Sequence, residues 1–205
     1  MRSSALVTLL LSVLSNGGLG DGISWSPGRS VVAAPAVVDS MPVPMEHQVN
    51  LILKILTYDR NLESRSGPDV RIGIVYFASD PGSVRARNEI ADVLQRFGDR
   101  TVNRLHVRYT PVEFVSETQF ESAVKAAQIN MLYITPGNTR NIDAVVRLSQ
   151  RQKILTATGV PQYVERGIAV GIDITPPNIM INLPSSKAAG SQFDASLLHI
   201  ARIVR

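Results

Sequence analysis

The residues best placed to do chemistry follow three apolar segments that we predict to be buried strands. Seven residues in these short polar segments form a candidate ligand site: Asp80, Gly82, Thr135, Gly137, Asn138, Thr158 and Gly159. Open parallel sheets bind ligands at the carboxyl ends of their strands, where the N–H groups of helix N-termini can hold a small anion or a carbonyl oxygen. Glycine, proline and asparagine are also ordinary turn residues, and we prefer that simpler interpretation of these segments.

Asp80 is the most tempting catalytic carboxylate, because it directly follows an apolar run. It also precedes Pro81. Aspartate is a favoured N-cap residue, and proline is favoured at the first helical position. We therefore predict that Asp80 caps a helix rather than acting in catalysis.

Other motifs of catalysis and metal binding are missing from the sequence. His47, His106 and His199 are isolated, and none belongs to a metal-binding spacing. There is no G-x-S-x-G elbow. The glycine-rich segment 17–22 follows no strand, as a phosphate-binding loop would. We expect no enzymatic activity, no metal and no cofactor.

The composition is that of one globular domain with a mildly basic surface. The chain has 205 residues, of which 44% are hydrophobic, so it can bury a substantial core. The net charge is +4 and the pI is about 9.7, but the charges are scattered and aromatic residues are only 5%. Nucleic-acid binding needs clustered cations, and single strands also need exposed aromatics, so we expect no nucleic-acid partner. A basic surface could still favour an acidic partner or a membrane surface.

The N-terminus predicts secretion. Arg2 precedes the apolar run Ala5–Leu14, which is followed by small residues. This order is typical of a signal peptide, which we place at residues 1–20, followed by a flexible leader at 21–44. The cleavage site stays open between Gly18–Gly20 and the more distant Ala34–Ala36, and a short N-terminal anchor or tail is the alternative. The apolar run is half of the about 20 residues that a membrane span needs, so we expect a protein that does not span the membrane.

The absence of cysteine limits the chemistry further. Without cysteine there is no disulfide, no thiol redox switch and no lipoprotein anchor. We therefore expect a soluble periplasmic protein.

Apolar runs and helical periodicities alternate through residues 45–205. Strands are predicted at residues 70–77, 105–109, 131–134, 154–157, 168–174 and 179–183, and helices lie between the first four. The short link before residue 179 predicts an antiparallel hairpin, and a final helix carries Leu197, Leu198, Ala201 and Val204 on one face. The fold class is therefore α/β, with a mostly parallel sheet of about six strands flanked by helices, in a Rossmann- or flavodoxin-like arrangement. It ends in the hairpin and the C-terminal helix.

The opening helix has an unusually wide apolar face. Leu53, Leu56 and Tyr58 are our candidates for a partner surface, which could also serve a homodimer. The alternative is that this face packs against the sheet, and we favour it for most of the residues.

Five segments together resemble the YfiR family of periplasmic proteins. They are Ile52–Asp59, Ile154–Thr158, Gly167–Gly171, Ile179–Leu183 and Ser196–Arg202. That family has an opening helix, an "iLTv" strand, a "GG-x-I" strand, a strand ending in "IN" and a final "S-x-LL-x-LA" helix. The resemblance extends over residues 45–205, which it identifies as a YfiR-like α/β domain.

The resemblance implies a regulatory role. YfiR-like proteins repress a membrane-bound diguanylate cyclase by binding its periplasmic sensor domain, and an outer-membrane lipoprotein can sequester them. Release of the cyclase raises cyclic-di-GMP and promotes biofilm formation. The best-known member of the family has cysteine pairs linked to its redox state, and this chain has none, so redox control is not implied. It also has only Gly167 where the family often has two glycines. The alternative function is a single-lobe small-molecule receptor related to periplasmic solute-binding proteins.

Overall fold

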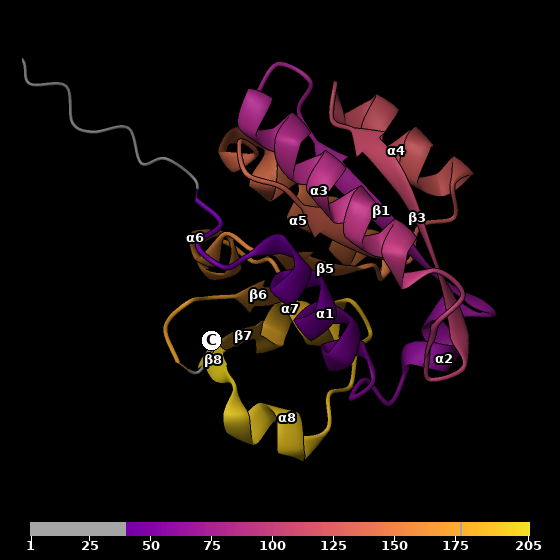
Figure 1. The fold of residues 1–205 in the computed structure, drawn as a ribbon, viewed down its shortest axis with the longest axis vertical. Coiled ribbons are helices and arrows are strands. Elements are labelled where there is room, and N and C mark those ends of the chain that lie inside the picture. The colour runs from indigo at the N-terminus through magenta and orange to yellow at the C-terminus, as the bar shows by residue number, and fades with distance from the viewer. Residues whose placement is uncertain (1–39, 177) are drawn as a thin grey trace, which may run out of the picture. The chain divides into compact units, whose positions relative to one another are not determined.

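The computed structural model describes residues 40–176 and 178–205 (Figure 1). The predicted signal peptide and all but the last residues of the predicted leader lie outside the described residues. Met41–Pro44, at the end of that leader, lie against the domain, and Val43 is buried. The packed chain therefore begins before Met45. Within the described ranges, no helix is long and apolar enough to cross a membrane.

A single eight-stranded sheet forms the centre of the domain, with the order β2-β3-β1-β4-β5-β6-β7-β8. The strands are β1 Asp69–Tyr76, β2 Thr101–Val102, β3 Leu105–Glu113, β4 Met131–Ile134, β5 Leu155–Thr158, β6 Val170–Ile172, β7 Ile179–Asn182 and β8 Arg202–Val204. Strands β3, β1, β4, β5 and β6 are parallel, and β6 and β7 form the antiparallel hairpin. The predicted α/β class with a mostly parallel sheet is confirmed. The two additional strands, β2 and β8, are short and lie at the edges.

Helices cover both faces of the sheet. They are α1 Met45–Leu56, α2 Leu62–Ser66, α3 Pro81–Phe97, α4 Glu117–Ala126, α5 Ile142–Gln152, α6 Pro161–Glu165, α7 Leu183–Ala188 and α8 Ala195–Ile200, with a 3₁₀ turn η1 at Thr139–Asn141. Apolar residues of α1, α3 and α8 build one core, and those of α4, α5 and α6 build the other. Figure 1 shows α1 and α3 in front of the sheet and α5 behind it. Strand β1 is apolar on both alternations because it lies between these two layers.

The predicted cap at Asp80 forms, and Gly98 and Ser116 mark two further helix ends. The Asp80 carboxylate accepts a hydrogen bond from the Ser83 N–H at 2.8 Å, and Pro81 opens α3. Gly98 ends this helix with a φ of 60°. The Ser116 hydroxyl oxygen accepts from the Gln119 N–H at 3.3 Å at the start of α4. These contacts depend only on residues three apart, which is why the sequence predicts them.

The predicted C-terminal helix is correct at its start and wrong at its end. Helix α8 stops at Ile200, Ala201 is extended, and β8 pairs in parallel with β7. The Arg202 guanidinium, on the first residue of β8, contacts the Asp173 carboxylate at 3.2 Å. The free edge of β7 offers backbone partners, and Ile203 and Val204 are β-branched residues that favour a strand.

Candidate functional site

A groove of about 850 Å³ lies at the carboxyl ends of β1 and β4. Strand β1 lies between β3 and β4 in the sheet. The chain first adds β3 on one side of β1 and then crosses over to add β4 and the later strands on the other side, so the strand order reverses at β1. Open α/β sheets bind their ligands at such a reversal of strand order, because the following loops diverge there and leave a crevice. Three segments line the groove: Met41–Gln48, residues 80–89 at the start of α3, and Pro136–Gly137 after β4.

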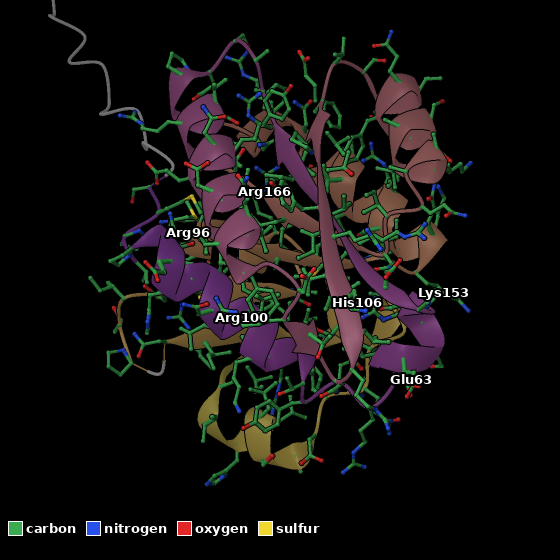
Figure 2. All side chains as sticks on the ribbon, turned by 45° about the vertical axis from the view of Figure 1, so that its right-hand side comes forward. Glu63, Arg96, Arg100, His106, Lys153 and Arg166 are labelled. Atoms are coloured by element: carbon green, nitrogen blue, oxygen red, sulfur yellow. The ribbon has the colours of Figure 1, made fainter. Side chains whose placement is uncertain are left out.

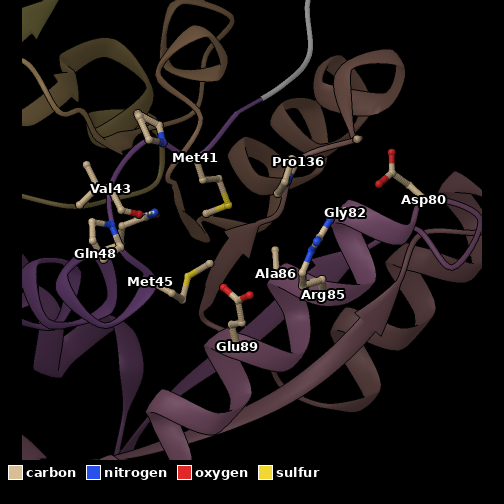
Figure 3. Close-up of a pocket in the computed structure, with 13 residues that line it drawn as sticks. Met41, Val43, Met45, Gln48, Asp80, Gly82, Arg85, Ala86, Glu89 and Pro136 are labelled. Atoms are coloured by element: carbon tan, nitrogen blue, oxygen red, sulfur yellow. Dashed lines mark hydrogen bonds between the residues drawn. The ribbon is translucent and has the colours of Figure 1, made fainter.

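The groove combines apolar walls with exposed charges (Figure 3). Met41 and Met45 enter it from one side, and Arg85 and Glu89 come from α3 on the other. Arg85 is exposed and forms no ion pair with any residue in the described part of the chain. An unpaired guanidinium beside methionine side chains suits a ligand with both an anionic and an apolar part.

Three of the seven predicted ligand residues line this groove: Asp80, Gly82 and Gly137. Gly137 has a φ of 81°, and a Cβ atom there would lie 2.6 Å from Asp80 Oδ2. Glycine is therefore required at position 137 for two reasons. Its backbone is left-handed, and any side chain would clash with the Asp80 carboxylate that caps α3.

The other predicted ligand residues are turned into the protein. Thr135, Asn138 and Thr158 are fully buried. The Thr135 hydroxyl donates to the Val75 carbonyl at 2.8 Å, and the Thr158 hydroxyl donates to the Ile134 carbonyl at 2.9 Å. The Asn138 amide donates to the Thr135 carbonyl at 2.9 Å. These contacts hold the strand ends together, as the turn interpretation requires, and they place the three residues outside the groove lining.

Gln48 fixes the N-terminal wall of the groove, and sequence reasoning missed it. Its buried side chain accepts from the Tyr133 hydroxyl at 2.7 Å and donates to the Val43 carbonyl. Burial raises the pKa of Tyr133 well above its ordinary value, so the hydroxyl remains a donor. Gly159 lies directly beneath, because a Cβ there would collide with Gln48 Oε1. The sequence did contain a signal for this role. Gln48 is a polar residue on the apolar helical face that contains Met45 and Ile52, and a buried polar side chain needs a hydrogen-bond partner.

The predicted partner surface on α1 does not form as expected. Leu53 and Leu56 are only 4% and 1% exposed, and both belong to the core between α1 and the sheet. The wide apolar face is needed because α1 contacts the sheet and α3 together. Tyr58 is half-buried, with the Lys54 ammonium 5.7 Å from its ring centre.

No group of three or more His, Cys, Asp or Glu side chains in residues 40–176 and 178–205 is arranged to hold a metal ion. His47, His106 and His199 are all exposed and lie on separate elements.

The fold and the groove define an α/β domain with a mostly parallel sheet and a groove at the reversal of its strand order. A conserved domain protein from Vibrio cholerae O1 biovar El Tor matches with a TM-score of 0.54 and 16% identity, covering 79% of this chain and 60% of that one. An ABC domain in complex with L-Trp from Streptococcus pneumoniae matches with a TM-score of 0.54 and 17% identity, covering 78% and 60%. The chain thus spans about 60% of the length of either structure, and at these identities the similarity shows the fold alone. Comparison with curated protein sequences finds no match.

The family model described as YfiR/HmsC-like (DUF4154) matches residues 48–202. The chain belongs to this family, and the match runs from α1 to the first residue of β8. This confirms the resemblance found in the sequence.

Proposed function

We propose that the chain is a periplasmic regulatory protein that represses a membrane-bound diguanylate cyclase by binding its periplasmic sensor domain. The observation that carries the proposal is membership of the YfiR/HmsC-like family over residues 48–202. Repression keeps cyclic-di-GMP low and limits biofilm formation. An outer-membrane lipoprotein that sequesters the repressor would reverse the effect.

The two neighbouring hydroxyls at the carboxyl edge have structural roles. Catalysis by a serine or threonine nucleophile needs the hydroxyl within reach of a general base. The Ser83 and Thr135 hydroxyls lie 2.6 Å apart, but both are fully buried, and each also contacts a backbone group of the strand end. Their hydrogen bonds stabilise the junction between β1 and β4 and leave no activated nucleophile there.

The decisive experiment deletes the gene and measures intracellular cyclic-di-GMP beside the parent strain. A rise in cyclic-di-GMP that the full-length gene reverses supports the proposal. The matched control is a copy that starts at Met41, which keeps the folded domain and lacks the predicted signal peptide, and it should not reverse the rise. Unchanged cyclic-di-GMP in conditions where the protein is made would exclude the role.

A binding experiment distinguishes a protein that represses the cyclase by direct contact from one that acts on it indirectly. The purified domain should be retained by the immobilised periplasmic domain of a cyclase from the same genome, without an added ligand. If the deletion raises cyclic-di-GMP but no such domain retains the protein, the repression is indirect.

One observation favours a second candidate, a small-molecule receptor. The groove at the strand-order reversal is within the range of about 300–1,000 Å³ that is usual for ligand sites. Arg85 with Asp80 and Glu89 offers both charges that a zwitterion needs. Amino acids, including the L-Trp found in the Streptococcus pneumoniae structure, are the first probes for a thermal-shift screen. A shift that Arg85→Gln abolishes and Arg104→Gln preserves would support this candidate, because Arg104 is exposed on the distant turn between β2 and β3.

A further inference from the structure

A second hollow lies at the opposite edge of the sheet, at the amino ends of β1, β4 and β5. It has a volume of about 380 Å³, and we call it the basic groove. Four cationic side chains line it: Arg65, Arg71, Lys125 and Lys153. The remaining polar side chains of its lining are those of Ser66, Gln128, Asn130 and Gln152, and no carboxylate belongs to the lining. Figure 2 labels Lys153 at this end, whereas Glu63, labelled below it, lines a different hollow.

Two residues of the lining, Arg65 and Ser66, each carry a buried hydrogen-bond donor that has no partner. The Arg65 side chain is only 8% exposed. Its two terminal nitrogens donate to the Asn130 carbonyl at 2.8 Å and to the Asp59 carboxylate at 3.0 Å, which leaves the Nε–H group unpaired. The Ser66 hydroxyl is also buried and unpaired. Within the described residues, four buried side-chain atoms lack a partner, and half of them belong to this groove.

The charges here are only partly neutralised. Lys125 pairs with Glu121 at 2.8 Å, and Arg71 lies 3.5 Å from Asp69, a carboxylate that also contacts Arg108. Lys153 is exposed and forms no ion pair with the part of the chain that the structure describes. The groove therefore presents a net positive charge to any ligand.

Helix dipoles explain part of this arrangement. Lys125 lies in the last turn of α4 and Lys153 caps the end of α5, where cations are stabilised by the negative end of a helix. The dipole does not explain Arg71, which is on a strand, nor the two unpaired donors. Buried donors are nearly always paired, so a missing acceptor is the simplest explanation for both.

We propose that the basic groove binds a phosphate group. Phosphate has several acceptor oxygens on one centre, so a group held between Arg71 and Lys153 can accept from the Arg65 Nε–H and the Ser66 hydroxyl once the atoms that cover these two donors move aside. The group belongs either to a free phosphate or phosphate monoester, or to the headgroup of an anionic phospholipid. This inference concerns the edge opposite the first groove and does not depend on the proposed regulatory role.

The test measures binding of inorganic phosphate to the purified protein by isothermal titration calorimetry and by thermal shift, at constant ionic strength. Saturable millimolar or tighter binding is expected. Ser66→Ala should weaken it several-fold while leaving the free protein as stable as before or more so, because the substitution removes an unpaired buried hydroxyl. Lys153→Gln should weaken it about tenfold, which corresponds to about 1.4 kcal/mol. Arg140→Gln, which removes an exposed cation of η1 at the opposite, carboxyl edge of the sheet, should leave binding unchanged.

A second arm distinguishes the source of the phosphate. Vesicles of phosphatidylglycerol are compared with vesicles of phosphatidylcholine in a sedimentation assay, with the same variants. Retention on phosphatidylglycerol alone that Ser66→Ala reduces, without binding of free phosphate, assigns the site to a lipid headgroup. Absence of both kinds of binding overturns the proposal. Binding that is insensitive to Ser66→Ala and Lys153→Gln overturns it as well, because the anion is then held elsewhere.

Discussion

Substitution of Gly159 by alanine tests the packing that supports the first groove. The added Cβ atom would collide with Gln48 Oε1 and lie 2.6 Å from Met41 Cε. Gln48 cannot simply swing away, because it is buried and holds both the Tyr133 hydroxyl and the Val43 carbonyl. The backbone of Gly159 itself is not left-handed, so the effect comes from crowding and not from backbone strain.

The expected destabilisation follows from two contributions. Forcing an extra carbon into a packed site costs about 1–3 kcal/mol. Displacing Gln48 also removes a hydrogen bond with a net value of about 0.5–1.5 kcal/mol. The free energy of unfolding should therefore fall by about 2–4 kcal/mol, and the thermal midpoint by roughly 5–15 °C for a domain of this size.

Urea denaturation followed by circular dichroism measures this change. A double-mutant cycle with Gln48→Ala is the internal control, because that variant removes the side chain that alanine at position 159 would meet. The two changes should be far from additive, with Gly159→Ala costing little in the Gln48→Ala background. A Gly159→Ala protein as stable as the parent, or strictly additive effects, would refute the reasoning.

Three further predictions concern single carboxylates. Asp80→Ala should lower the free energy of unfolding by about 1 kcal/mol through loss of the α3 cap, whereas Asp80→Asn should be nearly neutral in thermal denaturation. Asp59→Ala should cost about 3–5 kcal/mol in urea denaturation, because it leaves Arg65 buried without its carboxylate. For Asp194, the Ser196 N–H and then Arg60 lower the pKa to about 2, from an ordinary value of 3.8. Its contribution to stability is therefore present above about pH 4 and is lost as the pH falls towards 2, so the difference in thermal midpoint between the parent and Asp194→Asn should shrink over that range.

In the groove at the carboxyl ends of β1 and β4, the sequence predicted the lining residues that follow the two strands. It did not predict the lining residues that come from α1 and from the body of α3. Asp80, Gly82 and Gly137 follow β1 and β4 directly, so their position at the carboxyl edge follows from the predicted strands. Arg85 and Gln48 are ordinary helical residues in the sequence. They become part of the site only because α1 and α3 pack side by side over the sheet.

Short elements were the hardest to predict. Helices α2, α6 and α7 have five or six residues, which is too short for a helical period to stand out. The segment 202–204 continues the apolar spacing of the preceding helix, although Ile203 and Val204 are β-branched and favour a strand. The free edge of β7, more than twenty residues earlier in the chain, determines the outcome.

The sequence by itself determined the alternation of strands and helices, the caps at Asp80, Gly98 and Ser116, and the family. These features depend on residues a few positions apart and on the order of apolar segments, which a linear pattern records. Only the tertiary structure decided that Leu53 and Leu56 are core residues, and it alone brings Arg65 and Asn130 together at the basic groove. The reason is that burial and unpaired donors are properties of contacts between distant segments, and no local pattern in the sequence encodes them.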